Sequence, residues 1–275
     1  MEDYAIIVDL EVDLGGDRKD PSPYNKENTL AAIGYTTRRL DGSLMYEDDD
    51  ETVYIVRTAD ASSTDWATFK DVLKDATYVV AHNAKFDVAW LREVGIDCRS
   101  KIIDTMINEY ILNKGVRDKL SLKALAEKYD VTRKDDSLAD AFKQGLNYSD
   151  MSKEDQTTYL YYDIVATAEV FERQEALFKK NSNKSLIPIR DLMCEFCDVL
   201  TDIERAGMAI DTTEMHKVDH DYQVEQAELT EYLNSTVKKL VGDTPINLSS
   251  PEQLSQVIYS YKLKDKKTWR DVMNI

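Results

Sequence analysis

The chain has 275 residues, 43% of them hydrophobic, and its 52 acidic residues outnumber its 35 basic ones to give a formal net charge of −17. This composition excludes a disordered or low-complexity protein, and the length allows about two domains of ~100–200 residues each. The excess of acid argues against a protein that holds nucleic acid on a broad basic face, so composition alone argues against DNA as a partner.

The first half of the chain shows the patterns of β-strands separated by loops and short helices. We expect four strands, at residues 4–10, 29–38, 53–57 and 78–81. The polar, proline-containing stretch 15–28 predicts a loop, and the acidic run 47–51 predicts an exposed turn. Ser63 is expected to cap a helix, and residues 86–93 are expected to form a short helix after the fourth strand.

The second half of the chain has a largely helical pattern. We expect helices from Leu122 to Tyr129, from Ser152 to about Phe178, from Pro188 to Gly207 and from Thr213 to about Leu240, with Ser121 and Ser152 as caps of the first two. The third is expected to turn five apolar side chains inward, those of Leu192, Phe196, Val199, Leu200 and Ile203. The polar stretch 181–185 is a candidate domain boundary. Strands followed by helices indicate an α/β core with an added helical segment.

Four acidic residues stand where their side chains can share one crevice. Asp9 and Glu11 alternate along the end of the first strand, so both point to one face of the sheet. Asp87 follows the fourth strand, and Asp163 lies one helical turn after Tyr159, on the same helix face. Such a cluster repels itself and holds protons unless divalent cations neutralise it, and hard oxygen ligands favour Mg²⁺ or Mn²⁺ over zinc. Two such ions ~3.5–4 Å apart can activate a water and stabilise the leaving oxygen of a phosphodiester.

Three short motifs on these acids resemble the exonuclease motifs of the DEDD 3′→5′ exonucleases. They are Asp9-Leu10-Glu11, Asn83-Ala-Lys-Phe-Asp87 and Tyr159-Leu-Tyr-Tyr-Asp163. The resemblance is closest to the proofreading domain of family A DNA polymerases, the DNA polymerase I type. Residues 104–113 and 122–127 resemble the segment that joins the second and third motifs of that family, and 204–211 and 247–254 resemble the start of its polymerase domain. The resemblance covers nearly the whole chain.

The resemblance implies an RNase H-like exonuclease fold of the α/β class, with a mixed central sheet flanked by helices. This exonuclease domain is expected to span residues 1–182. Residues 186–275 are expected to form an α-helical segment that resembles the beginning of the polymerase thumb and is incomplete. No palm or fingers motif appears before Ile275, so polymerase activity is not expected from this chain alone.

The resemblance also assigns roles to the residues of the motifs. Four carboxylates match the ligands of two divalent cations, Mg²⁺ or Mn²⁺: Asp9, Glu11, Asp87 and Asp163. Tyr159 matches the tyrosine that orients the attacking water. A sister subclass has histidine five residues before the last aspartate, where this chain has Thr158, so the site is of the tyrosine type.

Four further residues are expected to contact the substrate. Asn83 and Phe86 match positions that help to hold the terminal nucleotide, and Phe86 stands where the family often has tyrosine. His82 and Lys85 flank them and are weaker candidates for the same role.

The function that the resemblance implies is metal-dependent 3′→5′ hydrolysis of single-stranded DNA ends to nucleoside monophosphates. The role would be proofreading, as part of a family A DNA polymerase or as its partner on a separate chain. Two alternatives stay open: a catalytically silent scaffold for a polymerase, and a 3′→5′ exoribonuclease of the RNase D type. The acidic charge predicts that the chain alone binds DNA weakly. Binding of a 3′ end would depend on divalent metal and on base stacking.

Other patterns predict no additional chemistry. The pair Cys194 and Cys197 has C-x-x-C spacing but no second pair, and we expect small residues on a packed helix face. His216 and His220 are expected on a solvated helix face. Asp104 could cap a helix or support the carboxylate site from behind, and the pattern favours the helix cap. No apolar run is long enough to span a membrane, the acidic start is no signal peptide, and three cysteines make no disulfide framework. We therefore expect a cytoplasmic protein, and the resemblance implies a bacterial or phage-infected cell.

Overall fold

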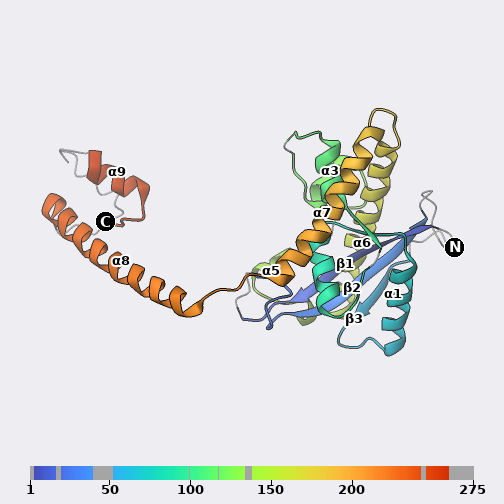
Figure 1. The fold of residues 1–275 in the computed structure, drawn as a ribbon, viewed down its shortest axis with the longest axis horizontal. Helices are drawn as coiled ribbons and strands as arrows, with labels where there is room; N and C mark the ends of the chain where they lie inside the picture. The colour runs from blue at the N-terminus through green and yellow to red at the C-terminus, as the bar shows by residue number, and fades with distance from the viewer. Residues whose placement is uncertain are drawn as a thin grey trace. The chain divides into compact units, whose positions relative to one another are not determined.

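A computed structural model describes residues 3–16, 20–39, 52–98, 100–116, 118–133, 138–242 and 246–259 of the chain (Figure 1). They fall into two compact units, Met1–Gly207 and Met208–Ile275. The larger unit holds the sheet and the acidic motifs. The run 47–51, expected to be a turn, lies outside the described residues.

The larger unit is built on a five-stranded sheet with the strand order β3-β2-β1-β4-β5. The strands are β1 (Tyr4–Asp13), β2 (Thr29–Arg39), β3 (Tyr54–Arg57), β4 (Tyr78–Ala81) and β5 (Lys101–Asp104). Strand β1 pairs antiparallel with β2 and parallel with β4, so the sheet is mixed and the expected α/β class is confirmed. The four expected strands are present. Strand β5 was missed because its four residues run directly into a helix.

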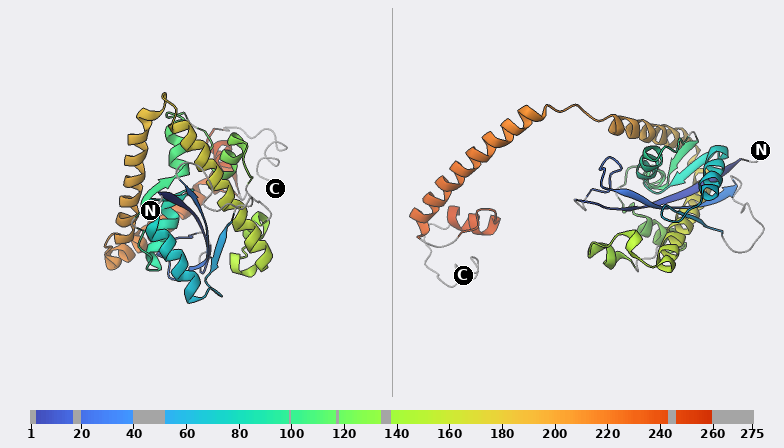
Figure 2. Two further views of the ribbon diagram at one scale, coloured as in Figure 1. Left: turned by 90° about the vertical axis from the view of Figure 1, so that its right-hand side faces the viewer. Right: turned by 90° about the horizontal axis from the view of Figure 1, so that it is seen from below.

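Helices cover both faces of this sheet (Figure 2). In the larger unit they are α1 (Ser63–Asp75), α2 (Ala84–Glu93), α3 (Thr105–Leu112), α4 (Leu122–Tyr129), α5 (Ala139–Lys143), α6 (Lys153–Phe178) and α7 (Ile187–Ala206), with the 3-10 turns η1 (Tyr148–Asp150) and η2 (Lys184–Leu186). The expected caps Ser121 and Ser152 are confirmed, since each hydroxyl accepts a hydrogen bond from the backbone N–H three residues later. The cap expected at Ser63 is wrong by one residue. Ser62 is the N-cap, because it stands three residues before Asp65 and forms a capping box with it.

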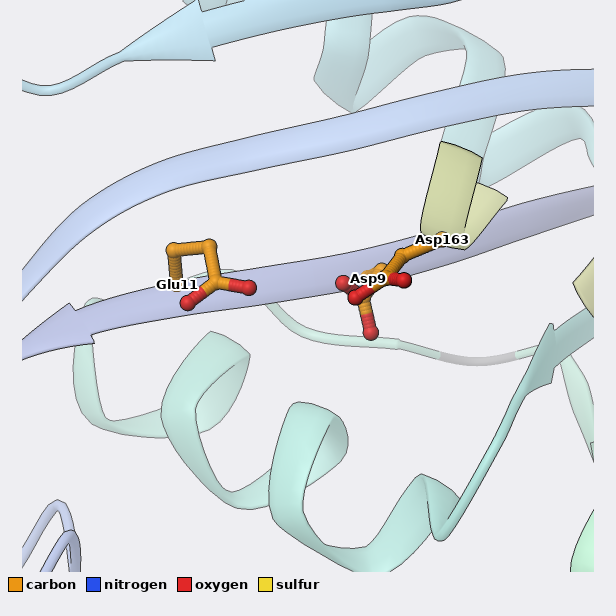
Figure 3. A group of neighbouring side chains, drawn as sticks. All are labelled: Asp9, Glu11 and Asp163. Carbon is orange, nitrogen blue, oxygen red and sulfur yellow. The ribbon is translucent and has the colours of Figure 1, made fainter. Parts of the chain in front are cut away.

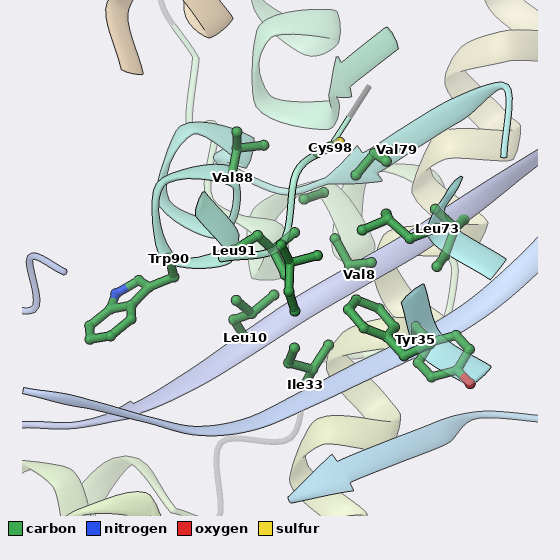
Figure 4. Close-up of a cluster of buried hydrophobic side chains, with 14 of the residues drawn as sticks. Val8, Leu10, Ile33, Tyr35, Leu73, Val79, Val88, Trp90, Leu91 and Cys98 are labelled. Carbon is green, nitrogen blue, oxygen red and sulfur yellow. The ribbon is translucent and has the colours of Figure 1, made fainter. Parts of the chain in front are cut away.

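Strand β1 sends alternate side chains to the two faces of the sheet. Val8 and Leu10 belong to the large apolar cluster beneath α1 and α2 (Figure 4). Ile7 belongs to a second cluster that includes side chains of α6. Asp9 and Glu11 follow Ile7 at intervals of two residues, so their side chains lie on the same face of the sheet as that of Ile7. The first motif therefore faces α6.

Helix α7 packs on the larger unit through a face other than the expected one. Its buried residues are Arg190, Cys194, Cys197 and Thr201. The prediction of five inward apolar residues is wrong, because Leu192, Phe196, Val199 and Ile203 are 51–65% exposed and Leu200 is half-buried. Small cysteine and threonine side chains allow the helix to approach β5, α2 and α3 closely, which bulky side chains would prevent.

Ion pairs fix this orientation of α7. Arg92 of α2 pairs with Asp198 at 2.5 Å and with Asp202 at 2.9 Å, and Lys85 pairs with Glu204 at 2.6 Å. The compact unit therefore extends to Gly207, past the stretch 181–185. The division into domains 1–182 and 186–275 stays a prediction.

The smaller unit begins with a long helix. Its described helices are α8 (Thr212–Val241) and α9 (Pro251–Tyr259). The first agrees with the helix expected at 213–240, and Asp211 caps it by accepting two backbone hydrogen bonds of 3.0 Å. His216 and His220 are exposed on α8, as expected. Among the helices of the described ranges, none combines the length and the apolar character that crossing a bilayer requires.

A candidate carboxylate site on β1 and α6

Three of the four motif acids come together between β1 and α6. Asp9 and Glu11 from the strand and Asp163 from the helix each offer a carboxylate oxygen, and these oxygens lie within 4.8 Å of one another (Figure 3). Asp163 is buried, and the two acids of β1 are half-buried. Acids from distant parts of the sequence therefore converge as the alternation on β1 and the helical spacing predicted.

The close approach of α6 to the sheet depends on a glycine. Gly34 of β2 is the register partner of Asp9. A Cβ atom added at Gly34 would lie 2.6 Å from Cγ of Leu160 and 3.1 Å from Cγ1 of Ile164, both on α6. The absence of a side chain at Gly34 lets the helix lie near enough for Asp163 to reach Asp9.

The first turns of α6 are held by buried hydrogen bonds to η1. Gln156 Nε2 donates to the backbone oxygens of Tyr148 and Met151, at 3.1 and 3.0 Å. The Tyr148 hydroxyl donates to the Gln156 backbone oxygen at 2.8 Å. These contacts fix the part of α6 that carries the third motif.

Asp87, the fourth acid, lies beside the group of three and is 2% exposed. Its Oδ1 accepts a hydrogen bond of 3.1 Å from the backbone N–H of Leu10, which places it against β1 next to Asp9. Burial raises the pKa of Asp87 well above its usual range, and the charges of Asp9 and Asp104 raise that pKa further. Negative charges that crowd together in this way favour a cation, which would offset their repulsion. Carboxylate oxygens suit a hard divalent ion.

Asp87→Asn is expected to stabilise the metal-free protein at neutral pH. The folded-state pKa of Asp87 is raised above the unfolded one, so the wild type loses stability as pH rises from about 4 through the folded pKa. An amide keeps the acceptor for Leu10 N–H but carries no charge to desolvate. Thermal melts in EDTA should show a higher Tm for the variant near pH 7 and no difference near pH 4. An equal difference in Tm between the variant and the wild type at both pH values would contradict this account.

Asp104 has a larger role than that of a helix cap. Its carboxylate caps α3 as expected, accepting from Met106 N at 2.8 Å. The same carboxylate accepts from Asn83 N and Ala84 N, both at 3.0 Å, at the start of α2. It thereby fixes the turn in which Asn83 has φ 67°, one turn before Asp87. The sequence indicated the cap more strongly than this second contact, because the strand that ends at Asp104 was not predicted.

The expected substrate-binding residues lie around the same turn. His82 Nδ1 is 2.9 Å from Thr105 Oγ1, and Phe86 packs half-buried against the cluster beneath α1 and α2. Lys85 makes the ion pair with Glu204 of α7 described above, so its amine is held toward α7. Contact of these side chains and Asn83 with a substrate stays a prediction.

Tyr159 lies on α6 one turn before Asp163, as predicted. It is 8% exposed, and its ring meets the Phe142 ring edge-on at a centroid distance of 5.7 Å. The aromatic contact holds the tyrosine against α5 and sets the direction of its ring.

Comparison with known protein families agrees with the site. A family model described as 3′-5′ exonuclease, of the DNA polymerase A type, matches residues 32–176. The match includes Asp87, Tyr159 and Asp163 and begins after Asp9 and Glu11.

Individual relatives point the same way. DNA polymerase I of Borreliella burgdorferi is 26% identical over 201 residues, which are 72% of this chain and 21% of that protein. The chain thus spans about a fifth of the length of this curated relative. The structure of the POL domain of Pol1 from M. smegmatis matches 97% of this chain and 39% of its own length, with TM-score 0.57 and 18% identity. Brucella melitensis NrnC with bound Mg²⁺ covers 74% of this chain and 86% of its own, with TM-score 0.52 and 17% identity. These two structures share the fold.

Proposed function

Because the chain belongs to the 3′-5′ exonuclease family of DNA polymerase A, we propose that it removes nucleotides from single-stranded DNA 3′ ends in a divalent-metal-dependent reaction. The observation that carries the proposal is the convergence of Asp9, Glu11 and Asp163 within 4.8 Å, with Asp87 against β1 beside them. Attack of water on the terminal phosphodiester breaks the bond to the 3′ oxygen. The products are a nucleoside monophosphate and a strand with a new 3′ hydroxyl.

The four carboxylates would hold two divalent cations, Mg²⁺ or Mn²⁺. When bound, such ions lower the pKa of water and neutralise charge on the phosphate. Glu11 and the Tyr159 hydroxyl would orient the attacking water, and Asp163 would fix the position of the site on α6. Asn83 and Phe86 would hold the terminal nucleotide, with His82 and Lys85 at its edge. Asp104 would position the turn that carries them.

The wild-type protein tests this proposal with matched 5′-labelled DNA and RNA oligonucleotides. Stepwise shortening of single-stranded DNA in Mg²⁺, which stops in EDTA, is expected. Faster shortening of RNA would overturn the DNA preference in favour of an exoribonuclease of the RNase D type. No shortening, together with no Mg²⁺ binding by calorimetry, would favour the silent scaffold.

Tyr159→Phe is expected to lower kcat by roughly 10²-fold with little change in KM, because one hydrogen bond to the reacting water is lost. The ring and its contact with Phe142 are kept. Tyr162→Phe is the matched control, since Tyr162 is on the same helix and 39% exposed. A kcat for Tyr159→Phe equal to that of the control would remove Tyr159 from the mechanism.

The biological role that we propose is proofreading with a polymerase. The curated relatives are DNA polymerases I of which this chain matches 21% and 18% of the length, so the polymerase domain would belong to the same longer chain or to a separate one. The three cysteines, Cys98, Cys194 and Cys197, are unpaired and buried, which supports a reducing cytoplasm. The bacterial relatives support the proposal of a bacterial or phage-infected cell. With a net charge of −17, the chain would rely on its polymerase for tight duplex binding.

A further inference from the structure

Helix α7 exposes an apolar face along its whole length. The large apolar side chains on this face are 37–65% exposed, and they are Ile189, Leu192, Met193, Phe196, Val199 and Ile203. They recur at intervals of three and four residues, so they form one continuous stripe, which we call the α7 stripe. The helix has 20 residues and is therefore about 30 Å long. A stripe of this extent is typical of a surface that another protein covers.

The larger unit does not cover the α7 stripe, because it already holds the opposite face of the helix. Cys194 and Cys197 are buried against that unit. The ion pairs from Arg92 to Asp198 and Asp202 hold the helix in this rotation. A rotation that turned the stripe inward would break both pairs and move the small cysteine side chains out of the contact. Cover for the stripe must therefore come from outside the larger unit.

Acidic side chains follow one edge of the α7 stripe. They also recur at intervals of three and four residues, and they are Asp191, Glu195, Asp198 and Asp202. Two of the four pair with Arg92 and one pairs with Arg190, while Glu195 is exposed and makes no ion pair with a described residue. Four acids against two arginines leave this edge negative. A negative edge repels phosphate, so the stripe suits a protein and not a nucleic acid.

A second copy of this chain does not complement the acidic edge. Two α7 stripes that face each other in antiparallel directions about a two-fold axis bring the same edge of each helix together, so acid meets acid. Parallel pairing places the acids against the other edge, which carries Glu204. Each copy also has a net charge of −17. The complementary partner is instead a protein with an apolar groove and lysine or arginine side chains along one edge of it.

The proposed function supplies a partner with this chemistry. The curated relatives are DNA polymerases I, of which the chain matches 21% and 18% of the length. It matches 39% of the POL domain of Pol1 from M. smegmatis. The greater part of such a polymerase thus has no counterpart in this chain. A protein that binds duplex DNA has basic surfaces for the phosphates, and a basic border beside an apolar groove suits the acidic edge of the stripe.

We propose that the α7 stripe is the docking surface for the polymerase part of a family A enzyme. The identity of the partner rests on the proposed function. The surface itself rests on the exposed stripe, its fixed orientation and its acidic edge. Docking there would fix the carboxylate site relative to the polymerase, because Arg92 ties α7 to α2 and α2 carries Asp87.

Leu192→Ser and Phe196→Ser test the docking. If the polymerase part is a separate chain, calorimetric titration should give a Kd about tenfold weaker for each variant. If it belongs to the same polypeptide, both variants should lower the Tm of the complete polymerase and leave the Tm of this chain alone unchanged, since both side chains are exposed in it. Val116→Ser is the matched control, because Val116 is 68% exposed in the larger unit and lies outside the stripe. It should behave as the wild type in both experiments.

Three outcomes would overturn the proposal. Wild-type Kd, or wild-type Tm of the complete polymerase, in both variants would remove the docking surface. A dimer of this chain alone in sedimentation, dissociated by Leu192→Ser, would replace the polymerase by a second copy. A lower Tm of this chain alone in both variants would show that the chain covers its own stripe.

Shortening of single-stranded DNA in Mg²⁺ separates this inference from the proposed function. The chain alone should shorten DNA at the wild-type rate in both stripe variants, because the stripe contributes no residue to the carboxylate site. If the wild type shortens no DNA, the exonuclease proposal fails. The titration and the melts then still decide whether the α7 stripe docks a polymerase.

Discussion

Asp9→Ala is expected to abolish Mg²⁺-dependent shortening of 5′-labelled single-stranded DNA, with a loss of roughly 10³-fold or more. Asp9 is central to the site because its carboxylate lies within 4.8 Å of those of Glu11 and Asp163 and its charge raises the pKa of Asp87. Its removal takes away one of the carboxylates proposed to hold the two ions. The measurement is the rate of shortening at saturating Mg²⁺, on a gel that resolves single nucleotides.

The loss must come from the site and not from unfolding. Removal of Asp9 relieves repulsion on Asp87, so the Tm of Asp9→Ala in EDTA should equal or exceed that of the wild type. Asp71→Ala, which removes an exposed acid from α1, is the matched control and should retain full activity. Full activity in purified Asp9→Ala would falsify the assignment of the site.

Gly34→Ala is expected to lower both activity and stability, although Gly34 is itself no ligand. The new Cβ would lie 2.6 Å from Leu160 Cγ, well inside contact distance, so α6 must move away from β2. Overpacking of a core typically destabilises a protein by about 1–3 kcal/mol. Displacement of Asp163 by about 1 Å is enough to lower the rate by roughly 10²-fold. Denaturant melts and the shortening assay measure the two effects.

A double-mutant cycle shows whether the two effects arise at the contact with α6. Leu160→Ala removes the atoms that the new methyl group meets, at the expense of a cavity. The double variant Gly34→Ala/Leu160→Ala should be more stable and more active than the sum of the single changes predicts. Strictly additive effects on stability and activity, or a Gly34→Ala protein with wild-type stability and activity, would show that α6 can accommodate a methyl group at Gly34 without moving.

The first and third motifs were predictable because each depends on a local period. Alternation along β1 puts Asp9 and Glu11 on one face, and four-residue spacing puts Tyr159 and Asp163 on one face of α6. What brings the two faces together is Gly34, and no local pattern relates a glycine in the second strand to a helix far along the chain. The positions of the acids allowed their convergence to be predicted, but its physical cause appears only in the structure.

The failures have a common physical origin in tertiary contacts. The periodic apolar stripe of α7 predicted that Leu192 and Phe196 point inward, but the helix buries the face that carries Cys194 and Cys197. The apolar period of a helix identifies an apolar face. It does not show whether that face packs against the rest of the same compact unit. In the same way, the second contact of Asp104 depends on the register between β4 and β5, which the sequence alone does not fix.

The buried cysteines make the chain convenient for labelling at chosen positions. Burial raises the pKa of the thiols of Cys98, Cys194 and Cys197 to about 11, so at neutral pH they are protonated and shielded from reagents. A single cysteine introduced at an exposed position of α1 or α8 would then react alone with a maleimide dye. One cysteine on each of the two helices would give a pair of dyes, and the distance between them can report where the helical unit lies when a polymerase and a frayed primer end are present. No native cysteine has to be replaced first.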